Sequence, residues 1–140
     1  MILIVDDDIA VRTSLALLLE NAGNKVCATG NAAEALDIIE RRIPELIILD
    51  LNFSIDTSGK EGMDFLKTIR SNHPVLPVIL ITGWASIELA VQGMKLGAND
   101  FINKPWNNDY VLQSVKTLLE LNTAKVNDST RKHLDKQYNF

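Results

Sequence analysis

A run of four large apolar residues, Leu46 to Leu49, lies between Pro44 and Asp50 and narrows the possible folds more than any other stretch. Such a short run without polar alternation is typical of a strand buried on both faces, as in a parallel sheet covered by helices. An ionised carboxylate is costly to bury without partners. Asp50, at the end of this strand, is therefore either hydrogen-bonded to a loop or a functional group, and this stretch alone favours neither reading.

The rest of the chain alternates between short apolar runs and segments with helical periodicity. Asp8 and Asn31 are predicted helix N-caps, and Gly23 and Gly97 are predicted helix stops. We predict further strands at residues 2–5, 25–29, 78–81 and 101–102. We predict helices with inward-facing Val11, Leu15, Leu18 and Ala22; Ala32, Ala35, Leu36 and Ile39; Gly62, Phe65, Leu66 and Ile69; Ile87, Ala90, Val91 and Met94; and Val111, Val115, Leu118 and Leu119.

Five strand-helix pairs in succession indicate right-handed crossovers and a parallel sheet with helices on both faces. The predicted class is therefore a three-layer α/β fold. Residues 123–140 lose the apolar periodicity, and we interpret them as a linker, or the start of a connecting helix, between a domain spanning residues 1–122 and an expected output domain. The interior Gly93 makes the fourth helix weak, because glycine costs about 1 kcal/mol relative to alanine in a helix.

Composition excludes several classes of protein. The 140 residues suit one globular domain, and the net charge of −4 argues against nucleic-acid binding, which usually needs a basic face. With Cys27 as the single cysteine, no intramolecular disulfide can form, which fits a reducing compartment. The apolar opening of residues 1–5 is too short for a signal peptide or a membrane span. We expect a soluble cytoplasmic protein.

Polar residues follow four of the predicted strands. In an open parallel sheet the carboxyl ends of the strands share one edge, where ligands bind, so these residues are expected to converge. Carboxylates that cluster repel one another unless a cation joins them, and an all-oxygen set suits Mg²⁺. A lysine and a hydroxyl suit phosphoryl oxygens. The candidate site consists of Asp6, Asp7, Asp50, Thr82 and Lys104.

These residues resemble the receiver domains of two-component response regulators. The stretches that carry the resemblance are Ile-Leu-Ile-Val-Asp-Asp-Asp at 2–8, Leu-Asp-Leu-Asn at 49–52, Ile-Thr-Gly at 81–83 and Phe-Ile-Asn-Lys-Pro at 101–105. The resemblance covers residues 1–122 and implies the flavodoxin-like fold, with five parallel strands in the order 2-1-3-4-5 and five helices.

The resemblance also implies roles for the site residues. Asp50 is expected to accept a phosphoryl group. Asp7 is expected to be a direct Mg²⁺ ligand and Asp6 an outer-sphere one, and Asn52 should offer its backbone carbonyl to the metal.

Three further residues resemble the switch of the family. Thr82 corresponds to the switch hydroxyl, Lys104 to the lysine that contacts the phosphoryl group, and Phe101 to the switch aromatic. The bond between Lys104 and Pro105 is expected to be cis. Phe101 is also an ordinary candidate for the core, because aromatic residues dominate cores.

A subgroup of regulators, those that activate sigma-54-dependent transcription, resembles this chain further. The stretches concerned are residues 52–54, 57–59, 61–62, 87–91, 94–98 and 104–106. This resemblance implies a longer protein with an ATPase and a DNA-binding domain. The loop from Phe53 to Glu61 is longer than is usual in receivers and lacks their common Met-Pro pair.

The resemblance implies a partner and a mechanism. A histidine kinase is expected to donate the phosphoryl group to Asp50, with Mg²⁺ screening the approach of two anions. The chain is then an acceptor that catalyses only its own phosphorylation and dephosphorylation, not a turnover enzyme. Phosphorylation is expected to change a surface that controls homodimerisation and a downstream output domain. No direct contact with nucleic acid or membrane is expected.

The residues leave two alternatives open, a phosphatase and a pseudo-receiver, and a third lacks support. A haloacid-dehalogenase-like phosphatase also uses a strand-end Asp, Mg²⁺, Thr and Lys, but its second Asp would stand where this chain has Asn52. A pseudo-receiver would be an interaction module that never carries phosphate, and the intact acid cluster argues against it. A flavin-binding protein of similar topology would need a Ser/Thr/Gly-rich phosphate loop after the first strand, which is missing.

Overall fold

The structure is a computed structural model that describes residues 1–51, 60–83 and 87–122. Strands and helices alternate along these residues, as the sequence predicted. The strands are β1 (Ile2–Val5), β2 (Val26–Thr29), β3 (Leu46–Asp50), β4 (Val78–Thr82) and β5 (Asp100–Asn103). The helices are α1 (Ile9–Asn21), α2 (Ala32–Arg41), α3 (Lys60–Asn72) and α4 (Ile87–Lys95), followed by a final helix at residues 108–122.

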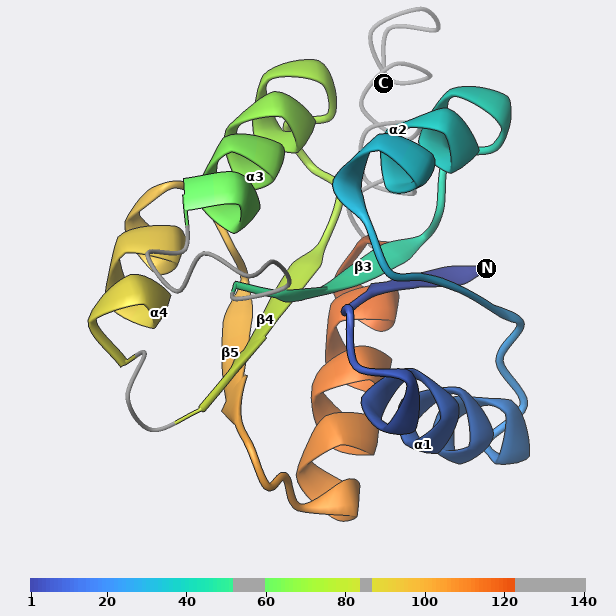
Figure 1. Ribbon diagram of the computed structural model, residues 1–140. Coiled ribbons are helices and arrows are strands. Elements are labelled where there is room, and N and C mark those ends of the chain that lie inside the picture. Colours follow the sequence, from blue (N-terminus) through green and yellow to red (C-terminus); the bar gives the residue numbers. More distant parts are fainter. Residues whose placement is uncertain (52–59, 84–86, 123–140) are drawn as a thin grey trace, which may run out of the picture.

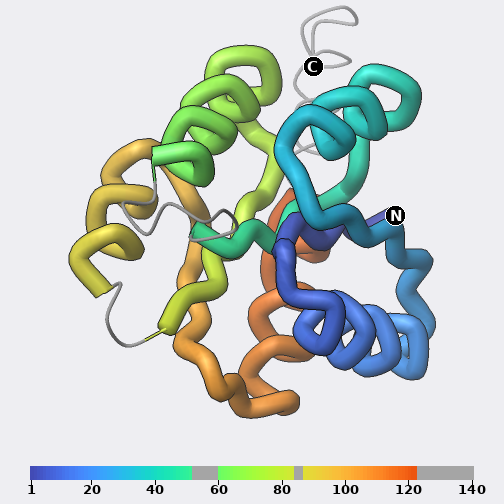
Figure 2. Tube along the Cα trace, in the orientation of Figure 1, coloured from blue at the N-terminus to red at the C-terminus, as the bar shows by residue number. Residues whose placement is uncertain are grey.

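All five strands are parallel and lie in the order β2-β1-β3-β4-β5. The prediction of a flavodoxin-like fold is confirmed. α2, α3 and α4 cover one face of the sheet, and α1 and the final helix cover the other (Figure 1). The Cα trace shows the same two helical layers with the sheet between them (Figure 2).

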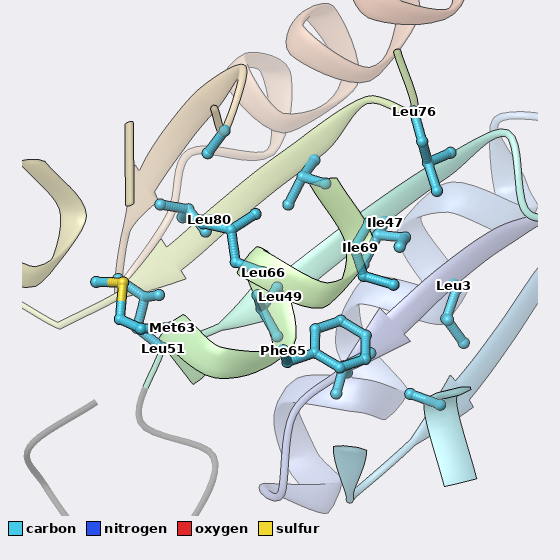
Figure 3. Packing of buried hydrophobic residues seen from close by; sticks show 14 of the residues in the cluster. Leu3, Ile47, Leu49, Leu51, Met63, Phe65, Leu66, Ile69, Leu76 and Leu80 are labelled. Atoms are coloured by element: carbon cyan, nitrogen blue, oxygen red, sulfur yellow. The ribbon is translucent and has the colours of Figure 1, made fainter. Parts of the chain in front are cut away.

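Alternate residues of each central strand supply two separate cores. Leu3, Ile47 and Leu49 face α2, α3 and α4, where they pack with Phe65 and Leu66 of α3 (Figure 3). Their neighbours in sequence point to α1 and the final helix, and the second core contains Ile2, Ile4, Leu46, Ile48, Leu15, Val111 and Val115. Because both faces are buried, β1, β3 and β4 have no polar position before their ends.

Side chains cap the first two helices as predicted. The Asp8 side chain accepts a hydrogen bond from Ala10 N, and the Asn31 side chain accepts one from Glu34 N. These bonds satisfy backbone donors that have no partner within the helix. Asp8 is thus a cap, and its carboxylate lies outside the acid cluster identified below.

The prediction for the inward face of α4 is partly wrong. Ala90 and Gly93 are buried, whereas Ile87 and Val91 are 38% and 47% exposed. The small residues face the sheet because α4 packs closely on β4: a Cβ at position 93 would overlap Leu80 Cδ1.

The prediction for α1 is wrong at one position. Ala22, predicted to face inward, is the exposed residue that ends this helix, and Leu19 is buried in its place.

Gly62, in the first turn of α3, lies against the backbone that follows Asp50. A Cβ at this position would be 2.7 Å from Leu51 O and 3.0 Å from Leu51 Cα. Both are backbone atoms, so no rotamer change can relieve the contact. The absence of a side chain at Gly62 therefore allows the first turn of α3 to lie directly against the backbone at the end of β3.

We predict that Gly62→Ala lowers the free energy of unfolding by about 2 kcal/mol, because the strain of overpacking exceeds the gain in helix propensity. Gly83→Ala is the matched control, since nothing lies within 4 Å of a Cβ there. Urea unfolding followed by circular dichroism measures both variants. Equal stability of the two variants would contradict the role of the close contact.

Candidate functional site

The carboxyl edge of the sheet brings the predicted site residues together. Asp6 directly follows β1, Asp50 and Thr82 are the last residues of β3 and β4, and Lys104 directly follows β5. The strands are parallel and in register, with Asp50 opposite Ile81 and Thr82 opposite Asn103. Residues up to 98 positions apart in the sequence thus meet at one place, as the sequence predicted.

Three carboxylates form the acidic part of this edge. One oxygen from each of Asp6, Asp7 and Asp50 lies within 4.8 Å of the other two. Asp6 and Asp50 are buried, whereas Asp7 is exposed. The donor set consists of hard oxygen atoms with one side open to water, which fits Mg²⁺ because that ion keeps several water ligands. The observed cluster therefore fits the metal that the sequence predicted.

Lys104 links two of the carboxylates. Its Nζ donates to Asp6 Oδ2 at 3.0 Å and to Asp50 Oδ2 at 3.3 Å. Burial alone would lower the pKa of Lys104, but the charges of Asp50 and Asp6 and the hydrogen bonds to both raise it above the ordinary value. The ammonium group is therefore charged at neutral pH and offsets part of the repulsion between the acids.

The Asp6 carboxyl has a raised pKa. Burial is the main cause, and the neighbouring charge of Asp50 adds to it. The backbone N–H of Asp8, which donates to Asp6 Oδ1 at 2.9 Å, and the Lys104 ammonium act in the opposite direction without cancelling the effect. Asp6 is thus a carboxylate that a further cation would stabilise.

Thr82 and Phe101, the predicted switch residues, lie on neighbouring strands. Thr82 is fully buried; its hydroxyl donates to Gly83 O at 3.4 Å, and its carbonyl accepts from Lys104 N at 2.7 Å. Phe101 is half-buried and packs against the core beneath α2, α3 and α4. The backbone thus joins the threonine directly to the lysine of the acid cluster. The Lys104–Pro105 bond is cis, as predicted.

Some predicted features lie outside the described residues. Asn52, the expected source of a carbonyl ligand, is one of them, as are most of the loop from Phe53 to Glu61 and the predicted linker at 123–140. The preceding residue is described: Leu51 N donates to Ile81 O at 3.4 Å. The chain is thus held to β4 up to the position before Asn52.

Sequence reasoning missed a carboxylate-centred cluster on β5. Asp100 accepts hydrogen bonds from the hydroxyls of Tyr110 at 3.0 Å and Ser114 at 2.6 Å, both on the final helix, and from the N–H of Phe101 at 2.8 Å. The only signal was the spacing of Tyr110 and Ser114, which places them on one helical face. Sequence reasoning also missed Arg12, which contacts the backbone of Asp6.

Comparison with known proteins supports the same interpretation. The sequence profile of the response regulator receiver domain matches residues 2–116. It describes a signalling receiver domain and not a classical enzyme. Among the residues that the structure describes, no helix combines the length and apolar character needed to cross a membrane.

Relatives of this chain include regulators of transcription and assimilation. The nitrogen assimilation regulatory protein NtrX of Azorhizobium caulinodans is 39% identical over 119 residues, which are 85% of this chain and 26% of that protein. The C4-dicarboxylate transport transcriptional regulatory protein DctD of Pseudomonas aeruginosa is 37% identical over 130 residues, which are 92% of this chain and 27% of that protein.

A solved structure has the same fold. The receiver domain of NtrX from Brucella abortus superimposes with a TM-score of 0.80 at 35% identity, over 86% of this chain and 98% of that one. The chain spans about a quarter of the length of the two curated relatives above. The profile match covers most of the chain, and the sheet order and the acid cluster agree with it. This chain therefore belongs to the response regulator receiver domain family.

Proposed function

We propose that this receiver domain accepts a phosphoryl group on Asp50 from the phosphohistidine of a histidine kinase. The observation that carries the proposal is the position of Asp50: a buried carboxylate at the end of β3, beside Asp6 and Asp7 and 3.3 Å from Lys104 Nζ. A nucleophilic carboxylate, two further acids for a metal and one fixed cation are the groups that phosphoryl transfer needs.

In the proposed reaction, a carboxylate oxygen of Asp50 forms a bond to phosphorus as the bond between phosphorus and the histidine nitrogen breaks. The nitrogen keeps the electron pair, and Asp50 becomes an acyl phosphate. The residues that would hold Mg²⁺ are Asp7, Asp50, Asn52 through its carbonyl and Asp6 through water. The metal would supply positive charge that screens the two anions. Lys104 supplies a second positive charge within the site and cannot turn away easily, because it is tied to both buried acids.

The acyl phosphate adds nearly two negative charges beside Lys104 and Thr82. In the proposed switch, the Thr82 hydroxyl moves toward a phosphoryl oxygen and Phe101 takes the space that it leaves. α4, β5 and the final helix then present a changed surface. To move the domain from mostly inactive to mostly active, phosphorylation must favour the active form by about 5 kcal/mol.

The changed surface is proposed to control homodimerisation and an output domain. The relatives are about four times as long as the match, which supports residues 123–140 as a linker to further domains. We propose that these act in sigma-54-dependent transcription, because the resemblance at residues 87–98 and 104–106 is to that group. The single cysteine supports a reducing cytoplasm as the compartment.

The acceptor is tested with Asp50→Asn. We expect incubation with Mg²⁺ and acetyl phosphate to give one labile phosphoryl adduct on the unchanged protein and none on the variant, because an amide is not a nucleophile for this transfer. Intact-mass spectrometry measures the adduct, and light scattering after size exclusion measures the accompanying change of oligomeric state.

Asp37→Asn is the matched control, since this acid lies on α2 with a side chain 68% exposed. It should be labelled like the unchanged protein. An adduct on Asp50→Asn would overturn the assignment of the acceptor. Mg²⁺ binding without any adduct on the unchanged protein would favour a pseudo-receiver, and continuous hydrolysis of a phosphate ester would favour a phosphatase.

The raised pKa of Asp6 predicts a pH dependence of Mg²⁺ binding. Protons compete with the metal, so Mg²⁺ affinity should fall as the pH is lowered toward this raised pKa, before an ordinary aspartate would titrate.

In the absence of metal, lowering the pH has the opposite effect on the stability of the fold: the contribution of Asp6 to the free energy of unfolding increases. The folded state holds this proton more tightly than the unfolded chain, so the contribution to stability is present at acidic pH and is lost as the pH rises through the raised pKa.

Calorimetric titration with MgCl₂ at several pH values, in buffers of different ionisation enthalpy, measures both the affinity and the protons released. Asp6→Asn should abolish the proton release that this carboxyl causes. A proton release that is unchanged in Asp6→Asn would show that another group is responsible.

A further inference from the structure

The peptide between Asp6 and Asp7 lies just beyond the point where β1 stops pairing with β2. The last residues in register are Val5 and Thr29. Asp6 N still donates to Thr29 O at 3.1 Å. The Asp6 carbonyl lies one step farther along and accepts a hydrogen bond from Arg12 Nη1 at 2.7 Å. An arginine thus bonds to the peptide that joins two acids of the cluster.

Arg12 is itself fixed relative to this loop. It lies in the first turn of α1, and its backbone N–H donates to Asp8 O at 3.0 Å. Asp8 caps the same helix through Ala10 N, and Asp8 N donates to Asp6 Oδ1. The three consecutive aspartates are therefore held by β2 at one end, by the cap at the other and by the Arg12 side chain between them.

Gly30 provides the space for the guanidinium group. A Cβ at position 30 would be 2.9 Å from Arg12 Nη1, 3.6 Å from Arg12 Cζ and 3.8 Å from Asp6 O. Only Gly23 and Gly97 among the described glycines have a positive φ, so the backbone at Gly30 does not itself require glycine. The missing side chain is needed for the close approach of Arg12 to the Asp6 carbonyl.

We propose that Arg12 is a positioning residue for the metal site. By holding the Asp6 carbonyl it fixes the plane of the peptide that joins Asp6 to Asp7, and so fixes the direction in which both carboxylates leave the backbone. The inference rests on the proposed function, since it assumes that these acids bind Mg²⁺. Groups that orient metal ligands commonly change affinity 10- to 100-fold when they are removed.

A positioning role and a purely electrostatic role of Arg12 predict opposite changes in Mg²⁺ affinity when Arg12 is removed. Arg12 carries a positive charge close to an acid cluster, so charge alone would make it repel Mg²⁺, and its removal would tighten binding. If Arg12 orients the ligands, its removal weakens binding. The sign of the change in affinity therefore separates the two roles.

The test measures Mg²⁺ affinity by calorimetric titration with MgCl₂ alone, on protein whose folding is verified by circular dichroism. Arg12→Met should weaken binding about tenfold. Arg12→Lys keeps the charge and one donor and should recover part of the loss. Gly30→Ala keeps the arginine but displaces its guanidinium, and it should also weaken binding. Arg41→Met is the control, because Arg41 lies on α2 with a side chain 81% exposed.

Each outcome either supports or overturns the positioning role of Arg12. Weaker binding in both Arg12→Met and Gly30→Ala, with Arg41→Met unchanged, supports the positioning role. Equal or tighter binding in Arg12→Met overturns it, and so does Gly30→Ala that binds like the unchanged protein. If Arg12→Met does not fold, Gly30→Ala and Arg12→Lys decide by the same criterion. An unchanged protein that binds no Mg²⁺ would overturn the proposed metal site itself and the inference with it.

Discussion

Two buried carboxylates that share one ammonium group are the interaction on which this edge of the sheet depends. Asp6 and Asp50 lie at the ends of neighbouring strands and would repel each other strongly without Lys104. Burial of an unpaired charge is costly, so the folded state requires the lysine to be in place. Lys104 follows β5, two strands away from β3. The charges therefore balance only when β1, β3, β4 and β5 are in place, which ties the integrity of the site to that of the fold.

Most of the fold and the composition of the site were predictable from the sequence for one physical reason. In a parallel sheet all strands end at the same edge, so the residues that follow apolar runs lie along that edge whatever the strand order. Asp6, Asp50, Thr82 and Lys104 were placed correctly on this basis. The strand order itself came from the resemblance to receivers. The inward face of α4 was misjudged because large apolar residues were taken as core, whereas the close approach of α4 to β4 selects Ala90 and Gly93.

The contacts that could not be predicted join side chains to distant backbone atoms. Arg12 binds the Asp6 carbonyl, and Arg70 donates to the carbonyls of Leu76 and Gly97, tying the end of α3 to the loops before β4 and β5. Periodicity identifies which face of a helix is apolar, but it does not show where a long charged side chain ends. Such contacts depend on the exact course of the loops, which the sequence pattern leaves open.

The geometry also indicates how a change at Asp50 would travel in the proposed switch. Lys104 joins Asp50 to the carbonyl of Thr82 through its own backbone N–H, so movement at the acid cluster acts on the ends of both β4 and β5. Asp100, at the other end of β5, binds the N–H of Phe101 and the hydroxyls of Tyr110 and Ser114. A shift of Phe101 would therefore disturb the hydrogen bonds of the Asp100 carboxylate, which holds the final helix to the sheet. Coupling of this kind needs no long chain of contacts, because one short strand carries the aspartate and the aromatic, and the lysine directly follows it.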